Sequence, residues 1–292
     1  MRVRTVLVLA VFLAGCGSSA GSTSGRVTVV AAENVYGNIA SQIGGPHVSV
    51  TSILTNPNAD PHLFEPATSN GLAVANARVV VQNGLGYDAF MTRLEDATPS
   101  KDRIVVTMAD ILGVHGKDAN PHLWYDVPAL RRIALAVADA LTRADPRHRP
   151  AYHEGLIRFI RSLDPLMHEV ASIGARYGGA PVAYTEPVPG YLLTAAGLRN
   201  LAPDAFTRPL EEGSEPTPAA VSAMDDLVAK RRIRALLYNS QAVSPITARL
   251  REAARGAGIP VVPVTETLPP GLTFQQWQLR QARALAAALE RR

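Results

Sequence analysis

The chain has 292 residues, of which 47% are hydrophobic, and a formal net charge of +4 that includes Arg2 and Arg4. This length is enough for two compact lobes of ordinary domain size. So small an excess of positive charge excludes the strongly basic composition that is typical of proteins binding nucleic acid or acidic polymers.

The N-terminal segment has the pattern of a secretory signal peptide. Residues 1–4 form a basic start, and the apolar run that follows is too short for a stable transmembrane helix. The run ends in Leu-Ala-Gly-Cys, which resembles the bacterial lipobox, and Cys16 is the only cysteine, so no intramolecular disulfide can form. We predict a signal peptide over residues 1–15, then a lipidated Cys16 and a flexible tether to residue 25. A free thiol in an uncleaved leader is the alternative. Lipidation would hold the mature protein on the outer face of the bacterial cell membrane.

Strands alternate with helices in the first half of the chain. Four short apolar runs are typical of buried strands: residues 26–31, 48–54, 78–81 and 103–106. An amphipathic stretch that ends at Gly44-Gly45 separates the first two runs. Because alternation of this kind predicts a parallel sheet with helical crossovers, we assign residues 26–145 to an N-terminal α/β lobe.

The second half repeats this alternation after a long helical segment. Apolar residues recur at helical spacing from residue 147 to residue 177, where Pro165 is expected to bend or restart the helix. Strand-like runs follow, and the chain closes with a helical pattern from about Phe274. We therefore predict an α/β protein of two lobes, each a mainly parallel sheet flanked by helices. A linking helix over residues 146–178 joins the first lobe to a C-terminal lobe over residues 179–292.

Two loops carry the same unusual pattern. Asp60-Pro61-His62 and Asn120-Pro121-His122 each place an imidazole directly after a proline, with an aromatic residue and a carboxylate close behind. Proline fixes its own backbone and extends the residue before it, so each histidine is presented from a stiffened loop. A lone loop histidine is usually a surface residue. The repeated context favours a pair of metal ligands instead, because neutral imidazole is the commonest metal ligand among side chains.

Two carboxylates follow strand-like runs of the second lobe. Glu186 comes directly after the run at residues 181–185, and Glu266 stands just beyond the last such run. Ligands of open α/β sheets gather beyond the carboxyl ends of the strands. We therefore expect both glutamates to face a shared cleft with His62 and His122. The alternative for each glutamate is an ordinary solvated loop side chain.

These motifs resemble those of the metal-binding solute-binding lipoproteins of bacterial ABC importers, in the family that carries zinc or manganese. The two Pro-His loops are similar to the family's pair, although Asn120 stands where the second usually begins with Asp. Glu186-Pro187-Val188-Pro189-Gly190-Tyr191 resembles the loop that supplies a third ligand, and Glu266 stands near the strand end where an acidic fourth ligand is usual. The resemblance covers essentially the whole mature chain.

The resemblance implies a monomer that captures one Mn²⁺ or Zn²⁺ and delivers it to an ABC permease and its ATPase, without catalysis. It also implies that the linking helix is rigid and that His62, His122, Glu186 and Glu266 hold the metal between the lobes. Two neutral imidazoles and two carboxylates would balance a divalent cation, and four protein ligands leave little room for an activated water. Zinc members often have His where this chain has Glu186, so the carboxylate favours manganese as cargo.

Three further side chains are expected around this site. Asn239 and Gln241 follow a strand-like run and are candidates for hydrogen bonds that orient the ligands from outside. Trp124, two residues after His122, could line the cleft or fill the core, and we favour the edge of the cleft. His115 stands in a short loop before the second Pro-His motif and is expected to be a loop residue without a ligand role.

Other functions are compatible with parts of this pattern. A surface-anchored metallohydrolase would need an open metal position and an unligated general base, and the sequence has no His-Glu-x-x-His motif. A binder of a metal chelate such as a siderophore would line its cleft with aromatic and Arg side chains. A surface adhesin would need no convergent set of ligands.

Overall fold

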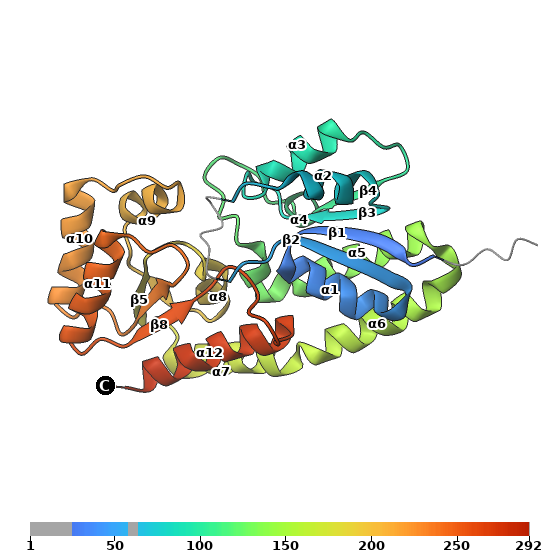
Figure 1. The fold of residues 1–292 in the computed structure, drawn as a ribbon. Helices are drawn as coiled ribbons and strands as arrows, with labels where there is room; N and C mark the ends of the chain where they lie inside the picture. Colours follow the sequence, from blue (N-terminus) through green and yellow to red (C-terminus); the bar gives the residue numbers. More distant parts are fainter. Residues whose placement is uncertain (1–24, 58–63, 292) are drawn as a thin grey trace, which may run out of the picture.

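The computed structural model describes residues 25–57 and 64–291, which form two α/β lobes (Figure 1). The first lobe holds a parallel sheet in the order β2-β1-β3-β4. Its strands are β1 (Val27–Glu33), β2 (Val48–Leu54), β3 (Val79–Gln82) and β4 (Ile104–Thr107). Its helices are α1 (Asn34–Gly44), α2 (Thr68–Ala75), α3 (Ala89–Ala97), α4 (Met108–Leu112) and α5 (Leu130–Ala144).

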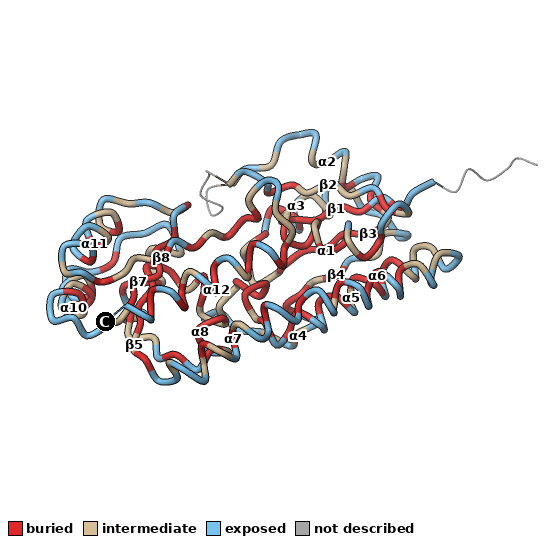
Figure 2. The backbone as a smooth tube through the Cα atoms, turned by 90° about the horizontal axis from the view of Figure 1, so that it is seen from below, coloured by how far each residue is buried: buried red, intermediate tan, exposed pale blue. Residues whose placement is uncertain are grey.

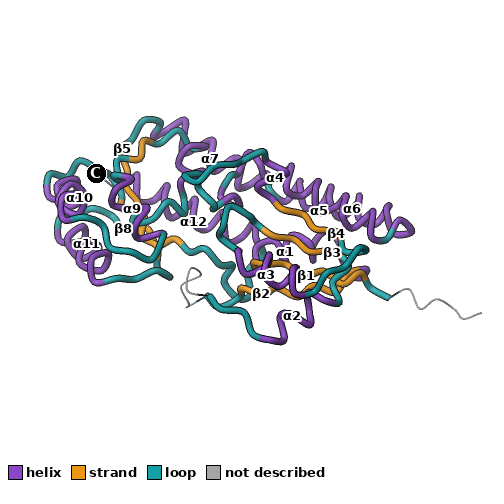
Figure 3. The backbone as a smooth tube through the Cα atoms, turned by 90° about the horizontal axis from the view of Figure 1, so that it is seen from above, coloured by secondary structure: helices purple, strands orange, loops and turns teal. Residues whose placement is uncertain are grey.

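Both faces of the first sheet are covered, as its near-continuous apolar strands predict. Successive side chains of a strand point to opposite faces, so Val29 and Ala31 join the main core while Val30 and Ala32 join a second cluster. The main core packs under α1 and α5, and the second cluster draws residues from α2 and α3. Figure 3 shows the four strands lying between these helices.

The second lobe repeats the design with a sheet in the order β6-β5-β7-β8, again parallel. Its strands are β5 (Pro181–Tyr184), β6 (Arg199–Asn200), β7 (Leu236–Asn239) and β8 (Val261–Val264). Its helices are α8 (Gly190–Ala195), α9 (Asp204–Glu211), α10 (Pro218–Ala229) and α11 (Pro245–Gly256). The predicted fold class of two parallel-sheet lobes is therefore confirmed.

The linking segment consists of two helices in line (Figure 1). They are α6 (Arg149–Ser162) and α7 (Asp164–Tyr177), separated at Leu163. Pro165 stands in the first turn of α7, where its missing N–H costs nothing, so the helix restarts there as the sequence predicts.

The final helix, α12 (Phe274–Glu290), lies along α7 and reaches both lobes. At its start, the Phe274 N–H donates to Asn38 Oδ1 (2.9 Å), and Gln275 Nε2 donates to Gln42 Oε1 (2.9 Å). Asn38 and Gln42 both belong to α1 of the first lobe. The segment that closes the chain therefore fastens the second lobe to the first.

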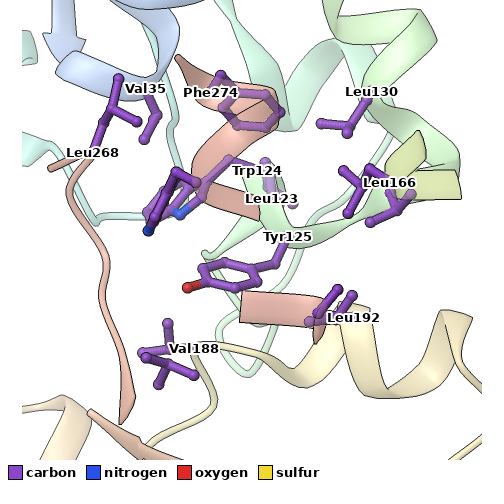
Figure 4. Close-up of a cluster of buried hydrophobic side chains, with 14 of the residues drawn as sticks. Val35, Leu123, Trp124, Tyr125, Leu130, Leu166, Val188, Leu192, Leu268 and Phe274 are labelled. Carbon is purple, nitrogen blue, oxygen red and sulfur yellow. The ribbon is translucent and has the colours of Figure 1, made fainter. Parts of the chain in front are cut away.

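One hydrophobic core runs through both lobes, and Figure 2 shows buried residues continuing along the inner faces of the helices between them. Figure 4 shows this continuity, because Tyr125 of the first lobe lies near Leu166 of α7 and near Val188 and Leu192 of the second lobe, and Phe274 of α12 belongs to the same cluster. Across the described ranges, no helix combines the length and the apolar character that a membrane span needs.

Candidate metal site

His122 is held in a fixed orientation by the residue that opens its loop. The His122 backbone N–H donates to Asn120 Oδ1 (3.0 Å), and the imidazole Nδ1 lies 2.9 Å from the same oxygen. Asn120 Nδ2 donates to the carbonyl of Pro187 (2.7 Å), which fixes the amide so that its oxygen faces the ring. The tautomer that satisfies this network carries its proton on Nδ1, leaving Nε2 available as a ligand atom.

Glu266 meets His122 across the boundary between the lobes. His122 Nε2 lies 3.1 Å from Glu266 Oε2, and both side chains are buried. With the Nδ1 tautomer, a lone pair of Nε2 and a carboxylate oxygen face each other. Two such acceptors are stabilised by a cation between them, whether a proton or a metal ion.

Glu186 lies beside Glu266, and one amide joins them. Glu186 follows β5, Glu266 follows β8, and Asn239 is the last residue of β7 between those strands. Asn239 Nδ2 donates to Glu186 Oε2 (2.7 Å) and to Glu266 Oε1 (2.7 Å). The carboxyl ends of three parallel strands thus gather two buried carboxylates at one point.

Gln241 stabilises the backbone of the turn that carries Glu266. Its Oε1 accepts hydrogen bonds from the N–H groups of Glu266 (2.6 Å) and Thr267 (3.1 Å). Its Nε2 donates to Thr267 Oγ1 (2.8 Å). Gln241 therefore holds the turn that carries Glu266, while Asn239 holds the two carboxylates themselves.

Trp124 lies in the core and not at the cleft edge where the sequence reasoning placed it. The side chain is fully buried, and its ring packs edge-on against Tyr36, Tyr87 and His122 at centroid distances of 6.2, 5.0 and 5.3 Å. The short 3₁₀ turn Leu123–Tyr125 directs three large side chains inward, where an apolar interior stabilises them. Trp124 therefore packs against the His122 ring from the side of the hydrophobic core.

Two of the candidate residues, Cys16 and His62, lie outside the residues that the structure describes. Within residues 25–57 and 64–291, no three His, Cys, Asp or Glu side chains are grouped closely enough to form a metal site among themselves. His122, Glu186 and Glu266 are nevertheless linked to one another through the contacts of Glu266 and Asn239. The exposed His115 stands apart from them in its loop.

Tyr87 belongs to the site, although sequence reasoning did not find it. Its hydroxyl donates to Glu266 Oε2 (2.9 Å), and its ring lies 5.6 Å from that of His122. Burial, followed by the negative charges of Glu266 and Glu33, raises the pKa of Tyr87 well above its ordinary value, so the hydroxyl remains a donor. The signal was the turn Gly84-Leu85-Gly86 before it, whose φ angles of +85°, +58° and +81° require glycine at two positions.

Glu211 is the second residue that sequence reasoning missed. It ends α9, and its Oε1 lies 3.7 Å from His122 Nδ1, with only 13% of the side chain exposed. It also lines an interlobe pocket of about 370 Å³, between Tyr87 and Asn120 of the first lobe and Pro187 of the second. Glu211 is therefore a third carboxylate near His122, and it lies where the interlobe pocket borders the candidate site.

Two more carboxyl groups form a buried pair near Tyr87. Glu33 ends β1, and Asp88 accepts hydrogen bonds from the N–H groups of Asn83 (2.6 Å) and Gly84 (2.9 Å). Burial, followed by the charge of Asp88, raises the pKa of Glu33 well above its ordinary value, and burial also raises the pKa of Asp88. This pair keeps a proton to higher pH than exposed carboxyl groups do.

Comparisons with known proteins identify the family of the chain. The family model "ZnuA: Zinc-uptake complex component A periplasmic" matches residues 29–288. The chain is 29% identical over 172 residues to the manganese-binding lipoprotein MntA of Halalkalibacterium halodurans, a match that spans 56% of this chain and 57% of MntA. It is 24% identical to the manganese ABC transporter substrate-binding lipoprotein scaA of Streptococcus gordonii, over 80% of each chain.

A solved structure shows the same fold. The binding protein FpvC of Pseudomonas aeruginosa, in complex with Mn²⁺, superposes with a TM-score of 0.77 at 19% identity. The match covers 91% of this chain and 98% of FpvC. At this level of identity the likeness concerns the fold alone.

Proposed function

The chain belongs to the ZnuA family of periplasmic zinc-uptake components, and we propose that it captures a divalent transition metal outside the cytoplasm and delivers it to an ABC permease. The observation that carries this proposal is the chain of contacts that links His122 to Glu266, and Glu266 through Asn239 to Glu186, in a buried position between the lobes. Two buried carboxylates are costly unless a positive charge accompanies them, and a divalent cation supplies it.

The proposed ligands are His122, Glu186, Glu266 and His62. The first three are supported by their contacts, and His62 by its Pro-His loop, which repeats the pattern of the His122 loop. Two neutral imidazoles and two carboxylates form a set of ligands whose charge balances that of a divalent metal. Since four protein ligands leave little room for an activated water, the site is suited to binding and release and not to catalysis.

Manganese is the cargo that the carboxylates favour, with zinc as a competitor. Carboxylate oxygens suit Mn²⁺, whereas imidazole-rich sites suit Zn²⁺. Zinc nevertheless binds a given set of ligands more tightly than manganese does across the divalent series. Selectivity in the cell would then come from metal availability and from which ion permits closure around the site. The relatives MntA and scaA carry manganese in their names.

Lipidation of Cys16 would keep the protein at the membrane, close to the permease. A single acyl chain anchors only marginally, so more than one chain is needed for stable attachment. Replacing Cys16 with Ser should move the protein from the membrane fraction to the soluble or secreted fraction. Continued retention of Cys16→Ser in the membrane fraction would contradict the anchor.

The ligand assignment can be tested by calorimetry and thermal unfolding with Mn²⁺ and Zn²⁺. His122→Ala and His62→Ala should each keep the fold and lose most of the metal-induced stabilisation, which follows RT ln(1 + [L]/Kd). His115→Ala removes an exposed loop histidine and is the matched control, with binding like that of the parent. Unchanged stoichiometry and stabilisation in both ligand variants would reject the assignment.

A further inference from the structure

Three arginines surround a pocket at the end of the first lobe that is opposite to the metal site. Arg26, Arg78 and Arg147 line this pocket of about 210 Å³, together with Asp145. Arg26 precedes β1, Arg78 precedes β3, and Arg147 lies in the turn between α5 and α6. The pocket therefore sits at the amino ends of the parallel strands, whereas the candidate metal site involves residues beyond their carboxyl ends.

The pocket carries a net positive charge, because three arginines line it together with a single carboxylate, that of Asp145. Among the described residues, none of the three arginines forms an ion pair with a carboxylate. The one acidic lining residue, Asp145, is engaged elsewhere, because its Oδ2 is bound by His148 Nδ1 and accepts a hydrogen bond from the Tyr152 hydroxyl (3.1 Å). Arg147 adds only a weaker attraction to that carboxylate. Three guanidinium groups around a hollow match the geometry and charge of a phosphate group.

The pocket also lies where the chain comes from the membrane. Figure 1 shows β1 starting at the end of the first lobe that is farthest from the second lobe. Gly25, the first described residue, lines the pocket itself. From a lipidated Cys16, the nine residues to Gly25 can span at most about 30 Å. In an anchored molecule, Gly25 and the pocket beside it therefore stay within about 30 Å of the lipidated residue and can reach the lipid headgroups.

We propose that Arg26, Arg78 and Arg147 form a docking site for the phosphate of an anionic phospholipid headgroup. While the anchored protein is not bound to the permease, this docking site would hold the first lobe against the membrane surface. This inference rests on the lipid anchor of the proposed function, but not on the identity of the metal. Because basic side chains near an anionic surface act additively, each arginine should contribute roughly five-fold to the binding constant.

The test uses the mature chain with Cys16→Ser, which carries no lipid, and sedimentation with vesicles. The vesicles consist of phosphatidylcholine alone or of equal parts of phosphatidylcholine and phosphatidylglycerol. The parent should bind only the anionic vesicles, and the binding should weaken as salt shortens the Debye length to about 8 Å at physiological ionic strength. The double variant Arg26→Gln/Arg147→Gln, both exposed residues, should lose roughly 25-fold in affinity.

The control makes the same change of charge elsewhere. Arg232→Gln/Arg255→Gln alters two exposed arginines of the second lobe and should bind anionic vesicles like the parent. Equal binding of the parent to both vesicles, or an equal loss in the two double variants, would overturn the proposal. A third outcome would also overturn the proposal. If inorganic phosphate raises the melting temperature of the parent but not of Arg78→Gln, and the parent binds no vesicles, the pocket binds a free anion and not a lipid headgroup. Metal binding in solution should be the same in all these variants, so failure here is distinguishable from failure of the metal site.

Discussion

Glu186 influences which metal the proposed site prefers, because it contributes a hard oxygen ligand. It places a carboxylate where an imidazole would make the site softer, and Asn239 Nδ2 holds one of its oxygens at 2.7 Å. Glu186→His should raise the ratio of zinc to manganese affinity, because imidazole suits Zn²⁺ and carboxylate suits Mn²⁺. Competition titrations with the two metals measure this ratio. Glu186→Asp, which keeps the carboxylate, is the control, and an unchanged ratio in Glu186→His would contradict the role of Glu186 as a ligand.

Glu33 makes stability depend on pH in a direction that can be worked out. Its pKa is raised in the folded protein, so its contribution to stability is fully present below the ordinary carboxyl pKa. That contribution is lost as the pH rises through the folded-state pKa. Glu33→Gln keeps the shape of the side chain without the charge. The stability of this variant, compared with the parent at the same pH, should therefore increase with pH, by about 1.4 kcal/mol for each unit of pKa shift.

Urea unfolding at about pH 5 and about pH 8 measures this difference for Glu33→Gln. Glu215→Gln removes an exposed carboxyl group and serves as the control. A constant stability difference between Glu33→Gln and the parent across this range would show that Glu33 ionises like an exposed carboxyl group. The fully buried position of Glu33 beside Asp88 is the reason to expect otherwise.

The residues of the site differ in how far sequence could reveal them. Asn239 ends the apolar strand β7 and Gln241 follows it, and parallel strands end at one edge, so the nearness of both residues to Glu186 and Glu266 could be predicted. The Gly84-Leu85-Gly86 turn could have marked Tyr87 as a candidate, but its contact with Glu266 could not be predicted, because it spans the two lobes and depends on how they pack. Local patterns carry no information about such packing.

At the scale of elements, α1 and α6 approach closely because Gly155 has no side chain. A Cβ at this position would overlap the backbone carbonyl of Ile43 in α1. Gly155→Ala should therefore push the helices apart and destabilise the protein by about 1–3 kcal/mol, in spite of the better helix propensity of alanine. Thermal or urea unfolding measures the loss.

Gly256 provides the matched control for this substitution. Gly155 lies inside α6, whereas Gly256 is the last residue of α11, and a Cβ at Gly256 would meet nothing within 4 Å. Gly256→Ala should be neutral or stabilise the protein by up to about 1 kcal/mol. A similar effect of the two substitutions would mean that contact with Ile43 does not limit the packing of α1 on α6.

The first-lobe strands and the last helix followed from the sequence, but the surfaces that they pack against did not. Runs such as Val79–Gln82 are short, apolar and β-branched, which indicates a strand buried on both faces. The last helix was also predicted, and the structure places it at Phe274–Glu290. Its contacts with α1 could not be foreseen, because amphipathic spacing shows that a helix is buried on one face and not which surface covers it.

At the scale of the whole molecule, the lobes share one hydrophobic core and are also joined by polar contacts. Tyr191 Oη donates to the carbonyl of Asn120 (2.8 Å), and Tyr87 reaches Glu266 across the same boundary. A shared core makes separate unfolding of either lobe costly, since each would expose apolar surface that the other covers. The lobes should therefore behave as one cooperative unit with the proposed metal site at their junction.

This expectation can be tested by urea unfolding with two independent probes. Trp124 and Trp277, the only tryptophans, are both buried near the junction, and Trp277 Nε1 donates to Thr265 Oγ1 (2.9 Å) beside Glu266. Their fluorescence and the far-ultraviolet circular dichroism of the helices in both lobes should give one coincident transition. Separate transitions for the two probes would show that the lobes unfold independently in spite of their shared core.

Metal should shift that single transition as a whole, because the proposed ligands come from both lobes and are brought together only in the folded molecule. At a free metal concentration of 100 times Kd, the added stability should be about 2.7 kcal/mol, with both probes still coincident. His122→Ala should keep the single transition and lose the shift. A metal that moved the fluorescence transition alone would instead be bound within a local unit around the tryptophans, which would contradict a site that depends on both lobes.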